Sequence, residues 1–241
     1  NYKFWFCTGS QDLYGDECLK QVAEDSRQMA EFLNEKLKDV AEVELVPTII
    51  NSESCIKIMR QASCDDDCIG VITWMHTFSP AKMWIRGLEV LTKPLLQLAT
   101  QHHKEIPWET IDMDFMNLNQ AAHGDREFGY IVSRLGIKRK VVVGHYTDPE
   151  VAEKLGTWAR ACAGWDASNN MKVMRWGDNM RNVAVTEGDK TEAERVFGAS
   201  INTWAVNELV AAYDAVKDDQ VAEALFKITY AYHSTVSFPD G

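Results

Sequence analysis

The sequence predicts an α/β fold: a doubly wound, mainly parallel sheet followed by the start of a second α/β domain. Short apolar runs alternate with amphipathic helical stretches over roughly residues 1–165, the order expected of successive βαβ units. One of these runs, Cys68–Trp74, is apolar almost throughout. Such a run is typical of a strand whose two faces are both covered by helices.

Five short apolar runs are the expected strands of the first domain: Lys3–Thr8, Val43–Val46, Cys68–Trp74, Pro94–Ala99 and Lys140–Val143. The first predicted helix, Asp16–Leu37, has apolar residues at helical spacing with charged residues and glutamines between them. The second runs to about Ser63, and Asn51 or Ser52 can cap it because their side-chain oxygens accept orphan backbone N–H groups.

Three more helices are expected between or after these strands. Pro80 suits the first turn of one of them, because its missing N–H has no helical partner there in any case. The next is predicted over residues 113–135, ended by Gly136, and the last runs from Pro149 to about Ala163, where Asp148 can cap it.

Residues 164–170 have turn-like composition, so we place the domain boundary at 168/169. The resulting domains are residues 1–168 and residues 169–241. Within the second we expect two strands, two helices and a turn-like tail: Met171–Trp176, Arg181–Thr186, Glu192–Phe197, Val206–Val216 and Ser237–Gly241. This second domain is short for an independent core, which indicates that it is incomplete.

The charge balance argues against two classes of partner. There are 25 basic and 36 acidic residues, giving a net charge of −11, and no Lys/Arg-rich cluster offsets it. We therefore expect no nucleic-acid and no membrane partner. No apolar run has the length of a membrane span, no signal peptide is recognisable, and six cysteines are too sparse for a disulfide scaffold. These observations predict a cytoplasmic protein with reduced thiols.

Polar segments follow the predicted strands, on the edge where open α/β sheets bind ligands. They mix small residues with amides, hydroxyls, imidazoles and aromatic rings: Gly9–Gly15, His76–Pro80, Asn117–Gly124, Gly144–Thr147 and Gly177–Arg181. Amides and hydroxyls offer paired donors and acceptors, which suit a polyhydroxylated ligand. Each segment also has a purely structural interpretation as a turn or a strand-to-helix connection.

Specific catalytic or metal motifs are absent from the sequence. Gly9–Gly15 is neither a P-loop nor a dinucleotide fingerprint, and Cys64-x3-Cys68 lacks a second ligand pair. Asp112 and Asp114 are better explained by helix capping and solvation. His123, beside small residues, is the histidine most suited to meet a ligand, although a packing or capping role is equally consistent with its position.

Six segments carry a resemblance that runs along essentially the whole chain: Phe4–Gly15 (FWFCTGSQDLYG), His76–Leu88 (HTFSPAKMWIRGL), Lys93–Gln101, Pro107–Gly129, Arg175–Lys190 (RWGDNMRNVAVTEGDK) and Ile201–Leu209. In the same order, they resemble the bacterial L-arabinose isomerases. The resemblance implies a Rossmann-like first domain and an aldose–ketose isomerase that converts L-arabinose to L-ribulose and often D-galactose to D-tagatose. It also implies a homo-oligomer, a hexamer in the family.

The resemblance further implies a Mn²⁺ ion held by two glutamates and two histidines, with a glutamate pair moving a proton between C1 and C2. Family chains are roughly twice as long as this one, and nothing in residues 1–241 matches those ligands or catalytic groups. No catalytic or metal-ligating residue is therefore expected in this chain. What carries over is a set of substrate-binding positions: Gln11, Leu13, Tyr14, Phe78, Gln120, His123 and Met180. The family places Gln120 and His123 in the site of an adjacent subunit.

Three hypotheses follow. The chain is the N-terminal part of such an isomerase, contributing the substrate side and the assembly surfaces and inactive alone. Alternatively, it is a non-catalytic sugar-binding or assembly module. The third alternative is a short isomerase with its own recruited metal site, built from His102, His103, His123 and Asp or Glu side chains across subunits.

Overall fold

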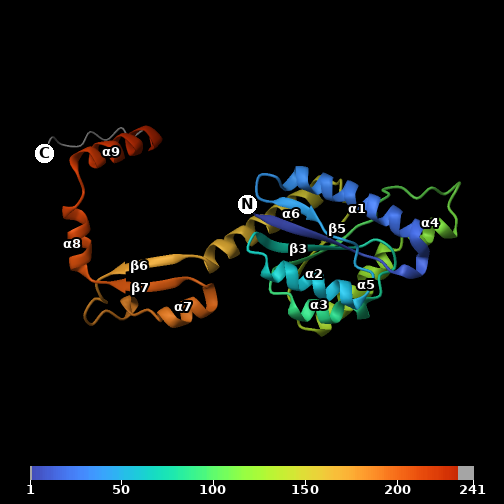
Figure 1. The fold of residues 1–241 in the computed structure, drawn as a ribbon, viewed down its shortest axis with the longest axis horizontal. Coiled ribbons are helices and arrows are strands. Elements are labelled where there is room, and N and C mark those ends of the chain that lie inside the picture. The colour runs from blue at the N-terminus through green and yellow to red at the C-terminus, as the bar shows by residue number, and fades with distance from the viewer. Residues whose placement is uncertain (1, 233–241) are drawn as a thin grey trace. The chain divides into compact units, whose positions relative to one another are not determined.

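Five parallel strands form the sheet that organises the first part of the chain (Figure 1). In the computed structural model, which describes residues 2–232, they are β1 (Lys3–Gly9), β2 (Glu42–Leu45), β3 (Cys68–Met75), β4 (Leu95–Ala99) and β5 (Arg139–Val143). Their order is β2-β1-β3-β4-β5, and every neighbouring pair is parallel. The predicted doubly wound parallel sheet is confirmed.

Helices cover both faces of this sheet (Figure 1). One face carries α1 (Gly15–Leu37) and α6 (Pro149–Asn169), and the other carries α2 (Ser52–Cys64), α3 (Ile85–Val90) and α5 (Ala121–Arg134). Successive strand side chains point to opposite faces. Phe4 and Phe6 of β1 therefore pack with the first group, whereas Cys7 packs with the second.

Two short 3-10 helices and one short α-helix complete the first unit: η1 (Asp12–Tyr14), η2 (Ala81–Trp84) and α4 (Met113–Leu118). The helix predicted over residues 113–135 is in fact two helices, because Asn119 and Gln120 leave the helical conformation. The Phe115 carbonyl accepts from both the backbone N–H and the side-chain amide of Asn119, each at 3.0 Å, where α4 ends.

Several local predictions are confirmed. Asn51 caps α2, accepting from the Ser54 N–H at 2.8 Å in a reciprocal capping box. Asp112 caps α4, as its structural interpretation proposed. Gly136 has φ +69° directly after α5, a conformation that favours glycine. All six cysteines are free, and four of them are buried.

The chain divides into two units, Asn1–Ala167 and Ser168–Gly241. The described part of the second unit has a two-stranded parallel sheet and three α-helices: β6 (Lys172–Trp176), α7 (Lys190–Phe197), β7 (Ser200–Trp204), α8 (Val206–Asp214) and α9 (Asp218–Tyr232). Within the described residues, no helix is long and apolar enough to cross a membrane.

Two predictions about residues 164–241 were wrong, two elements were missed, and one prediction lies outside the described residues. Residues 164–169 are not a linker but the last part of α6. The expected strand Arg181–Thr186 is a loop ending in η3 (Ala184–Thr186), where the Thr186 hydroxyl bonds back to Val183 O at 2.8 Å. Its place beside β6 is taken by β7, which was not predicted; α9 was also missed. The expected tail 237–241 lies beyond residue 232.

Candidate functional site

The carboxyl ends of β1 and β3 form the topological switch point of the first sheet. These two strands are neighbours, but the chain leaves β1 through α1 on one face and leaves β3 through α3 on the other. Open α/β sheets bind ligands in the crevice that such diverging connections create. The segments that follow the two strands, residues 10–14 and residues 76–80, are both polar segments that the sequence singled out.

Hydrogen bonds join these two segments. The hydroxyls of Ser10 and Thr77 lie 2.8 Å apart and are buried, and Gln11 Nε2 donates to Phe78 O at 3.1 Å. At Gly9 a Cβ atom would lie 2.8 Å from the Trp84 ring and would also clash with the Ser79 hydroxyl. Only glycine at position 9 therefore allows the end of β1 to lie this close to Ser79 and Trp84. This close approach holds Gln11 against the loop that carries Phe78.

Phe78 is stacked on His123. The two ring centroids are 4.4 Å apart and the ring planes differ by 20°. Phe78 is half-buried, whereas His123 is exposed. Both rings line an open hollow of about 550 Å³, together with residues on the next turns of α5. Two predicted ligand residues from distant parts of the chain thus share one surface.

Gly124 allows this arrangement. A Cβ atom at position 124 would lie 2.9 Å from Met75 Cβ and 3.2 Å from Thr77 O, closer than normal packing permits. The absence of a side chain lets the first turn of α5 rest on the end of β3 and on the loop that follows it. His123, the preceding residue, is thereby placed beside Phe78.

Two further predicted residues, Tyr14 and Gln120, lie near Asn117. Tyr14 and Asn117 line a second hollow, of about 320 Å³, between η1 and α4. Gln120 Nε2 donates to Asn117 Oδ1 at 3.3 Å. Leu13, in the same short helix as Tyr14, is 80% exposed.

Met180, the last predicted residue, belongs to the second unit. It is 63% exposed, and its backbone N–H donates to Thr186 Oγ1 at 3.1 Å. The structure thus connects Gln11, Phe78 and His123 by direct contacts, and Tyr14 lines one hollow with Asn117, the hydrogen-bond partner of Gln120. The ligand roles of all seven residues stay predictions.

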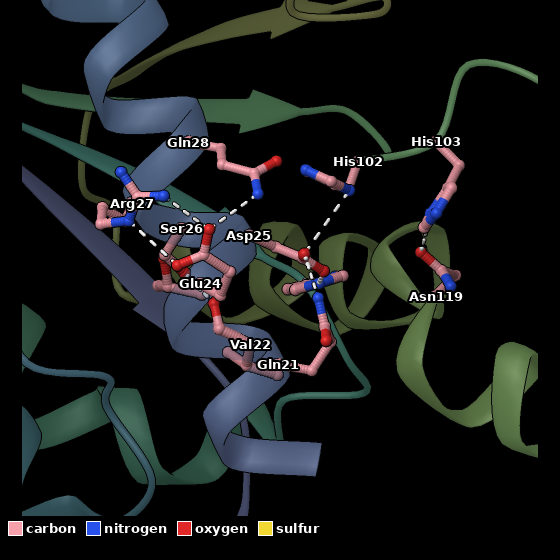
Figure 2. Close-up of polar contacts among 12 residues, drawn as sticks. Gln21, Val22, Glu24, Asp25, Ser26, Arg27, Gln28, His102, His103 and Asn119 are labelled. Atoms are coloured by element: carbon pink, nitrogen blue, oxygen red, sulfur yellow. Dashed lines mark hydrogen bonds and ion pairs between the residues drawn. The ribbon is translucent and has the colours of Figure 1, made fainter. Parts of the chain in front are cut away.

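A buried polar cluster beside this site was missed by the sequence analysis. Asp25 of α1 and His76 are almost completely buried, and His76 Nε2 donates to Asp25 Oδ2 at 2.6 Å. Gln21 Nε2 donates to Asp25 Oδ1 at 2.8 Å, and His102 Nδ1 lies 3.7 Å from the same oxygen. Figure 2 shows Asp25 between Gln21 and His102. One signal was present: Asp25 is a charged residue within the apolar stripe of α1.

Burial and pairing act in opposite directions on the acidity of this cluster. Burial raises the pKa of Asp25, but the hydrogen bonds from His76 and Gln21 and the nearby imidazoles outweigh it and lower the pKa below its usual value. Burial lowers the pKa of His102, an effect that the Asp25 carboxylate partly opposes. Asp25 is therefore a paired carboxylate anion in the folded protein at neutral pH.

A further cavity of about 460 Å³ lies at the carboxyl ends of β4 and β5. Its polar lining includes Thr100, His103, Asp125 and His145. Burial raises the pKa of Asp125 to about 7, although a hydrogen bond from Gln97 Nε2 at 2.9 Å opposes the shift. Burial thus moves the titration of Asp125 toward neutral pH.

The side chains present do not fit the Mn²⁺ centre that the resemblance implies for the family. Among residues 2–232, no group of three or more His, Cys, Asp or Glu side chains is arranged to hold a metal ion. His102 and His103 are neighbours, with ring centroids 5.1 Å apart, whereas His123 is stacked on Phe78. Within one described chain, the three histidines suggested as a recruited metal site are therefore not assembled.

The fold and the site define a class of protein: an α/β protein with a polar, aromatic-lined ligand edge at its switch point. Comparison with known families is more specific. Residues 1–170 match the model of the L-arabinose isomerase N-terminal domain, and residues 172–239 match that of the L-arabinose isomerase central domain. The chain belongs to the L-arabinose isomerase family.

Curated relatives agree with this assignment. The chain is 81% identical over 223 residues to an L-arabinose isomerase of Bifidobacterium longum, and 77% identical over 223 residues to one of Bifidobacterium adolescentis. It is 58% identical over 221 residues to one of Clavibacter sepedonicus. Each match covers 92% of this chain but 44% of the relative. The chain thus spans less than half the length of the curated relatives it matches.

Proposed function

We propose that this chain is the sugar-facing and assembly part of an L-arabinose isomerase. Such an enzyme interconverts L-arabinose and L-ribulose. We propose D-galactose and D-tagatose as a second pair of substrates. Membership of the family supports the reaction, and the connected contacts among Gln11, Phe78 and His123 carry the proposal for the sugar-facing role.

The chemistry of this surface suits a neutral sugar. Phe78 offers an apolar ring, His123 adds an exposed imidazole on the same wall, and Gln11 is fixed through its amide nitrogen. Aromatic surface with a few placed polar groups is the usual composition of small-molecule sites. In this proposal Gln11, Leu13, Tyr14, Phe78, Gln120 and His123 of the first unit and Met180 of the second unit are the positions that contact sugar.

The proton transfer itself requires groups beyond those described. Isomerisation moves a proton between C1 and C2 of the sugar, which calls for a positioned acid–base pair. Because the side chains of residues 2–232 do not fit the implied metal centre, we assign that step to sequence outside this chain. A Mn²⁺ ion, when bound there, would supply a Lewis acid for the sugar carbonyl. We also propose a cytoplasmic location, in keeping with the six free cysteines, and a homo-oligomer, as the family resemblance implies.

The test compares this chain alone with the whole protein. Each is incubated with L-arabinose and Mn²⁺, with EDTA as the control, and ketose formation is followed by NMR. We expect metal-dependent L-ribulose formation by the whole protein and none by residues 1–241 alone. Turnover by the short chain would favour a recruited metal site, and inactivity of the whole protein on both sugars would favour the non-catalytic module.

A further inference from the structure

We infer that Asp25 is a positioning residue for the Phe78–His123 wall and acts on it through His76. The inference rests on the proposed function, because it assumes that this wall faces the sugar. Asp25 lies in the middle of α1, far from the wall in sequence, and none of the family motifs above includes it.

The first step is the bond between Asp25 and His76. His76 is fully buried, Asp25 is 2% exposed, and 2.6 Å separates the carboxylate oxygen from Nε2. Removing the partner of a buried carboxylate strongly destabilises the folded state, because the charge then stays buried without compensation. The backbone at position 76 is therefore held at a fixed place relative to α1.

The second step leads from His76 to the ligand edge. One residue, Thr77, separates His76 from Phe78 along the chain, and the Thr77 hydroxyl bonds to Ser10 in the β1 loop. On its other side His76 stacks on Trp74, with centroids 4.2 Å apart and ring planes 17° apart. A shift of His76 would consequently move Phe78, its stack with His123 and its bond to Gln11.

The third step adds the end of β4. His102 Nδ1 lies 3.7 Å from Asp25 Oδ1, and the His102 carbonyl accepts from His145 Nε2 at 3.2 Å. Trp74 Nε1 donates to the Thr100 carbonyl at 2.9 Å. Asp25 thus contacts the segments after β3 and β4, and the second of these contacts the segment after β5. Figure 2 shows the carboxylate directed from α1 toward His102.

A purely structural role would have a different signature. Burying a charge among imidazoles contributes little stability compared with apolar packing, whereas it fixes one geometry. Loss of a structural residue loosens the whole unit. Loss of a positioning residue loosens the loop that it holds, while the remaining core stays protected.

The experiment uses the whole protein with three substitutions at this position: Asp25→Asn, Asp25→Glu and Asp25→Ala. Ser63→Ala is the matched control, because Ser63 Oγ donates to Met59 O and to Val90 O away from the ligand edge. Hydrogen exchange measured by mass spectrometry reports on residues 76–84 and 119–128 without requiring activity. Steady-state kinetics with L-arabinose provide the second readout.

For Asp25→Asn we expect faster exchange confined to these two segments, and a KM for arabinose raised about tenfold with a smaller change in kcat. Asp25→Glu should recover part of the KM, because a carboxylate still reaches His76. Ser63→Ala should leave both segments and the KM unchanged.

The inference would be overturned if hydrogen exchange in Asp25→Asn stayed slow in residues 76–84 and 119–128, or if it rose throughout residues 2–167. If Asp25→Ala fails to fold, the Asp25→Asn and Asp25→Glu variants still distinguish a positioning role from a purely structural one. If the unsubstituted protein proves inactive on sugars, the proposed function fails, but hydrogen exchange still tests the link between Asp25 and the wall.

Discussion

The ring of Phe78, from the loop after β3, stacks on the ring of His123, from the first turn of α5, with 4.4 Å between their centroids. Gln11, from the loop after β1, donates to the backbone of the same phenylalanine. Three connections that are separate in sequence therefore meet at the switch point of the sheet. This junction motivates two of the predictions that follow.

His123→Ala in the whole protein should lower kcat/KM for L-arabinose by about tenfold or more, in the range usual for loss of a substrate-contacting group. Because His123 is exposed, the Tm should change little. His103→Ala is a suitable control, since His103 is also an exposed imidazole but lies outside the Phe78–His123 hollow. Equal losses of Tm and activity in His123→Ala would show that the imidazole has a packing role instead.

Gly124→Ala should destabilise the first unit by about 1–3 kcal/mol, because the new methyl group meets Met75 Cβ and Thr77 O and no flexible side chain can yield. Gly164→Ala is its matched control. Gly164 is exposed in α6 and nothing lies within 4 Å of a Cβ there, so the change should stabilise by up to about 1 kcal/mol. Urea unfolding of both variants measures the difference, and equal effects would contradict the close packing of α5 on β3.

Asp125→Asn should change how stability depends on pH. Burial raises the folded pKa of Asp125 to about 7, above its ordinary value of 3.8. Between these values the folded state holds a proton that the unfolded state has released, so the stability contributed by this group falls as pH rises. In that range the free energy of unfolding of the wild type should fall, relative to that of Asp125→Asn, by up to about 1.4 kcal/mol per pH unit. Above it, the difference between the two proteins should stop changing.

Equilibrium unfolding in urea at a series of pH values measures this difference. The exposed Asp66, changed to Asn, serves as the control and should follow the wild type. A constant gap between wild type and Asp125→Asn from pH 4 to 7 would mean that Asp125 titrates normally.

Asn51→Ala should cost about 1 kcal/mol, because it leaves the Ser54 N–H at the start of α2 without its side-chain acceptor. Asn51→Asp keeps an acceptor oxygen at the same place and should retain most of the stability. Thermal unfolding compares the two variants. A similar loss of Tm in both would indicate that the amide group, rather than the cap, matters at this position.

Local patterns account for the elements that were predictable. The strands of residues 3–143 are short apolar runs bounded by polar residues, α1 and α2 carry their own periodicity, and α2 also carries its own N-cap. The break at Asn119 was missed, because the apolar pattern continues across Asn119 and Gln120, whereas the backbone of these two residues leaves the helical conformation. In the second unit, Arg181–Thr186 has the apolar content of a strand, but β6 pairs with Ser200–Trp204 after the crossover through α7.

By itself the sequence determined the fold class, the order of the main elements in the first unit and the segments that carry the family resemblance, because periodicity, caps and motifs are properties of neighbouring residues. Only the tertiary structure decided that Phe78 stacks on His123 and that Asp25 binds His76. Those contacts depend on the strand order and on which helix covers which face of the sheet. A buried carboxylate also finds its partners across elements rather than along the chain, so its role becomes visible only once the sheet is assembled.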